Sequence, residues 1–324
     1  MIKPLLRLQK YEHKIFSLLK KAGKLGELRQ LGFSRKDKHG FKFPIYQLTF
    51  GKKSAVKNRS ILLVAGVHGL ETVAVNILLD YLNQALRDGP VLSALKSGKL
   101  AIVAIPILNP GGLARQSRSN PGGVDLMRNS GVEGENALFF FGGQKLSGRL
   151  PYYQGKKLEP ESILLFRALR DLYDAERKTP LIALDVHSGY GNKNYIWWPY
   201  AKTRTPSPDD MLFRRITGYM EKTKLHNAYH YGPQSEMYTT HGDLWDLFYD
   251  HFLKFRELKK KAPPFLPFTL EIGTWTHFKK NPTRILKKRE IFNPPRNLKK
   301  QFVTGHREFL HDFSLLGIRN VNEI

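Results

Sequence analysis

The chain has 324 residues, 41% of them hydrophobic, which is enough apolar material for one large globular domain. Its net charge of +25 favours contact with polyanions, but no nucleic-acid-binding motif accompanies the charge, so nucleic acid is not an expected partner. The chain has no cysteine, which excludes disulfides and thiolate metal sites. No apolar run reaches the ~18 residues that a membrane-spanning helix needs.

Residues 1–40 predict a basic helical extension at the N-terminus. Over residues 1–35, apolar residues recur at helical spacing between lysines and arginines. Lysines and a glutamate interrupt this segment before a long apolar stretch can build up. This argues against a secretory signal peptide, and we therefore expect a cytoplasmic protein. A second basic segment, with Lys259–Lys261 and Lys287–Arg289, lies towards the C-terminus.

Residues 41–324 predict a single α/β domain. Alternating apolar residues at 41–46 indicate an edge strand, and residues 72–86 have the apolar spacing of a helix. Short apolar runs, typical of strands buried on both faces, lie at residues 61–65, 100–105, 181–184 and 268–270. Because strands alternate with helices, we expect a central mixed, largely parallel twisted sheet with helices on both faces.

Polar residues follow these buried runs, where α/β sheets bind their ligands. His68 and Glu71 follow the first run, and His187 follows the third. Imidazole nitrogen and carboxylate oxygen are ligands that zinc accepts, and catalytic zinc sites commonly have three protein ligands. A histidine that caps a turn and a glutamate that stabilises a helix start would also explain the first pair.

Two further carboxylates have the same kind of position. Asp185 precedes His187 by two residues, so both side chains project from the same side of the strand. It is either a core carboxylate or a residue that orients the histidine. Glu271 ends the fourth run, and a buried carboxylate there needs a partner or a task. Beside a metal-activated water, Glu271 would be the general base.

Arginines lie between these positions. Arg115 and Arg118 follow the segment Asn109–Gly112, and Arg128 lies in the segment Gly123–Asn129. Guanidinium groups bind carboxylates and developing oxyanions, although by composition alone these side chains would be surface charge.

In this order the motifs resemble those of the zinc carboxypeptidase family, which includes pancreatic carboxypeptidases, bacterial murein tripeptide amidases and cytosolic deglutamylases. The similarity spans residues 60–275. Its matched segments are His68–Glu71, Asn109–Gly112, Arg118–Asn120 with Gly123–Asn129, Tyr152–Gly155, Glu159–Glu161, His187, Tyr238–Asp246 and Glu271.

The resemblance implies a catalytic domain at residues 41–324 and a role for each matched residue. His68, Glu71 and His187 would bind one zinc ion per chain. Arg118, with Arg115 as the alternative, would polarise the scissile carbonyl. The resemblance also implies that Arg128 and Tyr238 hold the C-terminal carboxylate of a peptide substrate and that Glu271 is the base.

The chain departs from the family pattern at two positions. Met127 replaces an asparagine before the carboxylate-binding arginine, and Leu70 replaces a frequent arginine before the ligand Glu71. Cues about the substrate disagree. The net charge favours an acidic or murein-derived peptide, whereas Leu244, near the position that sets side-chain preference in the family, favours a hydrophobic or neutral C-terminal residue.

Two other functions compete with a carboxypeptidase. One is an amidohydrolase of a small acylated amino acid, like aspartoacylase or succinylglutamate desuccinylase, and the other is a basic, non-catalytic polyanion-binding protein. The remaining candidates are surface histidines (

Overall fold

The computed structural model describes residues 2–173, 176–222, 228–259, 262–275 and 291–319. Its centre is an eight-stranded sheet in the order β1-β2-β4-β3-β5-β8-β6-β7. The strands are β1 Gly26–Phe33, β2 Pro44–Gly51, β3 Ser60–Ala65, β4 Ala101–Ile105, β5 Leu181–Ser188, β6 Asn194–Trp198, β7 Tyr229–Pro233 and β8 Phe265–Ile272. The four neighbours β4, β3, β5 and β8 run parallel, while β2 and β6 flank them in the antiparallel direction. The predicted mixed, largely parallel sheet is confirmed.

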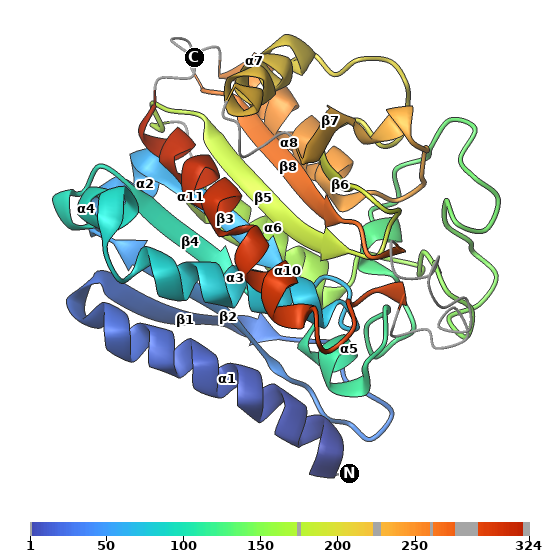
Figure 1. The fold of residues 1–324 in the computed structure, drawn as a ribbon. Coiled ribbons are helices and arrows are strands. Elements are labelled where there is room, and N and C mark those ends of the chain that lie inside the picture. Colours follow the sequence, from blue (N-terminus) through green and yellow to red (C-terminus); the bar gives the residue numbers. More distant parts are fainter. Residues whose placement is uncertain (1, 174–175, 223–227, 260–261, 276–290, 320–324) are drawn as a thin grey trace.

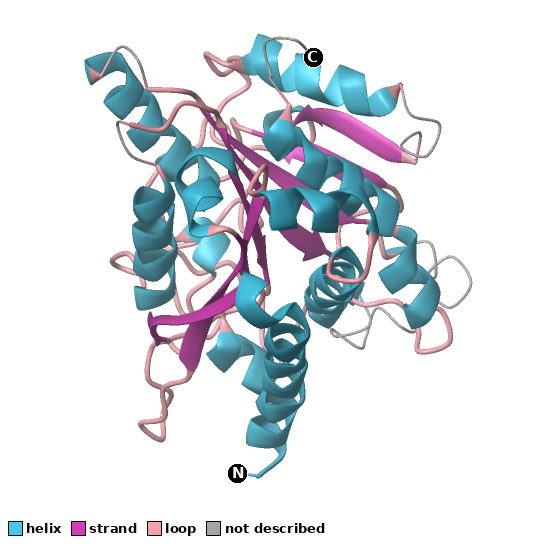
Figure 2. Ribbon diagram, turned by 90° about the vertical axis from the view of Figure 1, so that its left-hand side faces the viewer, coloured by secondary structure: helices cyan, strands magenta, loops and turns pink. Residues whose placement is uncertain are grey.

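Helices cover both faces of the sheet, as Figure 2 shows. One apolar cluster lies beneath α1 Ile2–Ala22, α3 Thr72–Ala85, α4 Gly89–Ser97, α7 Asp210–Glu221, α10 Lys299–Gly305 and α11 Arg307–Leu315. The other lies beneath α6 Pro160–Leu172 and α8 Leu244–Leu258, while the short helices α2 Lys53–Arg59 and α5 Pro110–Arg115 flank strand ends. Among the described residues, no helix is long and apolar enough to cross a membrane.

The central strands are buried on both faces, as their apolar sequences predict. In β3, Ile61 and Leu63 belong to the first cluster, whereas Leu62 and Val64 belong to the second. This alternation follows from the two-residue period of a strand. The four predicted strands and the helix predicted at residues 72–86 are all present.

The N-terminal segment differs from the helical prediction. The helix ends at Ala22, and residues 26–33 form β1, which is the edge strand of the sheet. The strand expected at residues 41–46 begins at Pro44 and lies inside the sheet, because β1 pairs with its outer side. A division of the chain at residue 40 stays a prediction.

Two strands that the sequence did not predict, β6 and β7, extend the sheet beyond β8. β6 contains the buried residues Trp197 and Trp198, which had been expected to be core or loop anchors. His230 lies exposed in β7 rather than on a helix, and His226 lies outside the described residues.

Candidate active site

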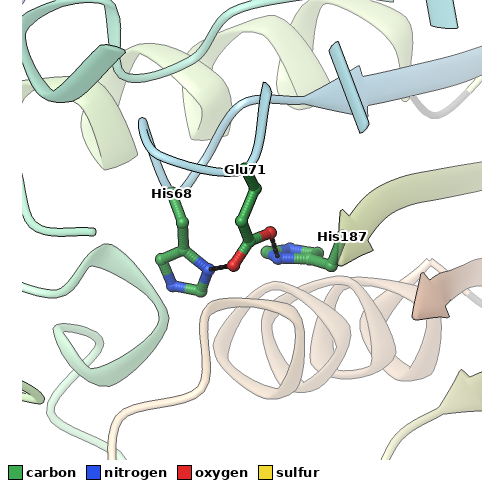
Figure 3. Close-up of side chains that lie close together, drawn as sticks. All are labelled: His68, Glu71 and His187. Atoms are coloured by element: carbon green, nitrogen blue, oxygen red, sulfur yellow. Dashed lines mark hydrogen bonds and ion pairs between the residues drawn. The ribbon is translucent and has the colours of Figure 1, made fainter. Parts of the chain in front are cut away.

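The three predicted metal ligands come from the ends of two neighbouring parallel strands. His68 and Glu71 lie in the turn between β3 and α3, and His187 lies at the end of β5. Because parallel strands end at the same edge of the sheet, the turn and the strand end meet. Their ligand atoms all lie within 4.8 Å of one another, and Figure 3 shows the three side chains converging.

Buried carboxylates orient the two histidine rings. The Nδ1 atoms of His68 and His187 face Glu71, at 2.7 Å from Oε1 and 3.2 Å from Oε2. The opposite Nε2 atoms lie 2.9 Å from Asp125 and 2.7 Å from Asp185. A carboxylate at Nε2 favours the tautomer with the proton on Nε2. The Nδ1 lone pairs then point towards the Glu71 carboxylate, which is the arrangement that a shared metal ion needs.

Arg118 extends this cluster of charges. Its Nε donates to Asp125 at 2.8 Å, and one of its terminal nitrogens lies 3.5 Å from Glu71. Burial opposes ionisation of Asp125, but the positive charges of Arg118 and His68 hold the pKa of its carboxyl well below the usual range. Asp125 therefore stays ionised and acts as an acceptor for both of its partners.

Glu271 lies next to His187, because β8 pairs with β5 in the register that places these two residues side by side. Its Oε1 accepts a hydrogen bond from the backbone N–H of Tyr190 at 3.0 Å. Burial and the negative charge of Glu71 raise the pKa of Glu271 to about 8. A cation held by the neighbouring ligands would lower this pKa, which leaves a carboxylate able to exchange a proton near neutral pH.

Arg128 is held by backbone carbonyl groups. One terminal nitrogen donates to Met127 O at 2.9 Å, while Nε and the other terminal nitrogen donate to Phe141 O, each at 3.1 Å. The guanidinium has five N–H groups, so two remain for which the described part of the chain supplies no acceptor. Gly242, with φ of 70°, brings the loop after Tyr238 against Arg128; a Cβ there would lie 1.9 Å from the Arg128 carbonyl oxygen.

These groups line one cavity of about 520 Å³. It contains the predicted site residues His68, Glu71, Arg118, Arg128, His187, Tyr238 and Glu271. Arg115 is exposed, donates to Pro121 O and does not line the cavity. Leu244 is fully buried outside it, while Met127 and Asp243 lie in its wall. His241 accepts a hydrogen bond from Gly134 N, as a turn residue would.

A family model described as zinc carboxypeptidase matches residues 27–290. The chain belongs to the zinc carboxypeptidase family. No curated protein sequence matches it.

Solved structures of zinc carboxypeptidases share the fold. Bovine thrombin-activatable fibrinolysis inhibitor, in complex with tick carboxypeptidase inhibitor, is 20% identical over 96% of both chains, with a TM-score of 0.68. Carboxypeptidase A from Helicoverpa armigera is 17% identical over 93% of this chain and 74% of its own, with a TM-score of 0.58. A metallo-carboxypeptidase from Burkholderia cenocepacia is 12% identical over 95% and 68%, also with a TM-score of 0.58.

The donor set of this zinc carboxypeptidase family member fits the metal that the family uses. Zinc is held by imidazole nitrogen and carboxylate oxygen, and two histidines with one glutamate are an established catalytic set. Here the three donors are buried, and carboxylates hold the far sides of both rings. The His-Glu-His group could therefore bind a metal ion.

Sequence reasoning missed several residues that shape the cavity. Asp125 lay within a matched segment, and its position in that motif could have indicated its role. Tyr152 also lay in a matched segment, and its ring centroid is 5.1 Å from the Arg118 guanidinium carbon, within cation–π range. Phe292, which lines the cavity from the C-terminal part of the chain, had no comparable signal.

Proposed function

We propose that the chain is a zinc-dependent metallocarboxypeptidase that hydrolyses a C-terminal peptide or isopeptide bond. His68, Glu71 and His187 would hold one zinc ion per chain. The observation that carries the proposal is the convergence, in one cavity of about 520 Å³, of these ligands with a buried carboxylate and two arginines. Metal binding alone would not need the additional groups.

Each group in the cavity has a part in amide hydrolysis. When bound, zinc supplies a Lewis acid that polarises a carbonyl group and acidifies water. Glu271 would take the proton of the attacking water and later deliver it to the leaving amine. Arg118 keeps its positive charge, because the negative charges of Asp125 and Glu71 outweigh its burial and raise its pKa. It would stabilise the negative charge that develops on the carbonyl oxygen.

The other end of the cavity would bind the substrate's terminal carboxylate. The two remaining N–H groups of Arg128 can bind a carboxylate with charge-assisted hydrogen bonds. Tyr238, stacked at 5.2 Å against Tyr190, lies beside this position and would close over the bound carboxylate. Met127 offers no donor there, so Arg128 would carry most of the binding.

The cavity wall favours a neutral, apolar C-terminal residue. Apolar and aromatic side chains dominate the lining, among them Met127, Leu138, Phe141, Trp197 and Met237. Asp243 lies in the same wall, where its charge would oppose an acidic side chain. An acidic or murein-derived substrate is supported by the net charge of the chain alone, and the same library can test it.

Metal analysis and peptide hydrolysis together test the proposal. The purified protein should contain one zinc ion per chain and release C-terminal residues from a peptide library that includes murein tripeptide. A chelator should abolish the release. His187→Ala should lose both metal and activity, because it removes a ligand, whereas Arg115→Gln should keep both. Full hydrolysis by metal-free protein, or no release from any peptide by zinc-loaded protein, would refute the proposal.

A further inference from the structure

A groove of about 620 Å³ lies between α1, α3 and α10 and shares no lining residue with the catalytic cavity. Figure 1 shows α3 lying between the N-terminal helix α1 and the C-terminal helix α10. The groove is lined by four basic residues from opposite ends of the chain, Lys14, Arg296, Lys299 and Lys300.

The negative charge at this groove is already balanced. Asp80 is the one acidic residue among the described residues that line it. Both of its carboxylate oxygens pair with Arg307, at 2.6 and 2.9 Å, and Arg307 lies outside the lining. Burial and the positive charge of Lys10 lower the pKa of Lys14, as expected where cations outnumber anions. A net positive charge is therefore concentrated in a concave site.

Polar groups complete the groove. The Lys14 ammonium donates to the side-chain oxygen of Asn76 at 2.8 Å, which holds it at the α3 side. Ser17 and Asn83 add neutral polar groups to the lining. The volume is in the range of small-molecule sites, so a small ligand fits better than a folded partner.

We propose that this groove binds a small anion that carries several negative charges. Lysine and arginine side chains make charge-assisted hydrogen bonds to both phosphate and carboxylate groups, so either group can supply the charge. A bound anion would connect α1 to α10. The segment that leads to α10 also reaches the catalytic cavity through Phe292, and its Asn293 bonds to Val73 N and Leu70 O at 2.9 and 2.8 Å.

Calorimetric titration of the full chain with tripolyphosphate and with citrate tests the inference. We expect binding of at least one of them, with a rise in thermal midpoint because the anion binds the folded state. Arg296→Gln with Lys300→Gln, both exposed, should weaken this binding by about tenfold or more. The matched pair Lys156→Gln with Lys157→Gln removes the same charge from other exposed positions and should keep the affinity.

The outcomes separate the groove from other sources of anion binding. Binding of tripolyphosphate alone identifies phosphate as the ligand chemistry, and binding of citrate alone identifies carboxylate. Arg128→Gln should bind the anion as the unchanged chain does, because Arg128 lies in the catalytic cavity. If neither anion binds, or if the control pair weakens binding equally, the inference is overturned. The readout is binding, so the result does not depend on whether the chain hydrolyses peptides.

Discussion

At the scale of single residues, Glu271 combines burial with a position beside the metal ligands. Its carboxyl group is 8% exposed as a residue, faces the negative Glu71 and receives one backbone hydrogen bond, from Tyr190. These surroundings raise its affinity for a proton, which suits a group that must take a proton and then return it. Its side chain is not one of the three ligands, so catalysis and metal binding can be separated by mutation.

Glu271→Gln should retain zinc and reduce kcat by about 10³-fold, because an amide cannot accept the proton while the ligands are intact. Zinc content and kcat measured on the same preparation check this. Glu133→Gln is a matched control, since Glu133 has a side chain 63% exposed and lies outside the cavity. Normal turnover in Glu271→Gln would rule out Glu271 as the base.

Arg128→Gln should raise KM by about 100-fold for peptides with a free C-terminal carboxylate. Loss of charge-assisted hydrogen bonds to one group costs ~3 kcal/mol. Because Met127 supplies no donor, no neighbour compensates through the side chain at that position. Steady-state kinetics would show the change, with Arg115→Gln as the exposed control. An unchanged KM in Arg128→Gln, or a large rise in Arg115→Gln, would contradict the assignment.

At the scale of elements, local pattern predicts the buried strands but not the edges of the sheet. Residues 61–65 and 181–184 are continuous apolar runs because both faces of their strands are covered. β1 contains Arg29 and Gln30 and is only half-buried, so its leucines resemble a continuation of the preceding helix. β6 and β7 are fixed by pairing with β8 and with each other, and no local pattern encodes that pairing.

The same distinction applies to the candidate site. His68 and Glu271 could be predicted because a strand end exposes them at the edge of the sheet. Tyr190 contributes a backbone N–H to Glu271, which almost any residue type could provide. Phe292 reaches the cavity by tertiary packing of a distant segment. Neither role leaves a mark in the residue pattern.

Ile15→Ala should lower the free energy of unfolding by about 2–4 kcal/mol, because it removes buried apolar groups and leaves a cavity. Ile15 is 1% exposed and belongs to the apolar cluster on the α1 face of the sheet. Denaturant unfolding measures the change. Leu6→Ala, at a position 55% exposed on the same helix, should change stability by less than about 0.5 kcal/mol. Equal small effects would show that α1 is an appended helix that contributes little to the domain.

At the scale of the whole molecule, the C-terminal helices close the same face of the sheet that α1 and α3 cover. Phe309, Leu310 and Phe313 of α11 are buried in that cluster. His306 lies between α10 and α11, is 5% exposed, and has its Nδ1 2.7 Å from the Tyr229 hydroxyl of β7. The junction of the C-terminal helices with the far edge of the sheet therefore contains a titratable group.

Burial lowers the pKa of His306 from 6.5 to about 4, so the folded chain should lose stability in acid through this residue. Above pH 6.5 the ring is neutral in both states and the stability is fully present. As the pH falls from 6.5 to 4, the unfolded chain binds the proton and the folded chain does not, which removes up to about 3 kcal/mol. Urea unfolding at pH 7 and pH 5 measures this loss. His306→Gln does not titrate and should lose less stability between the two pH values, whereas His39→Gln, at an exposed position, should behave like the unchanged chain. Because the variant can keep an acceptor for Tyr229, an equal loss in His306→Gln and the unchanged chain would assign the acid sensitivity to other groups.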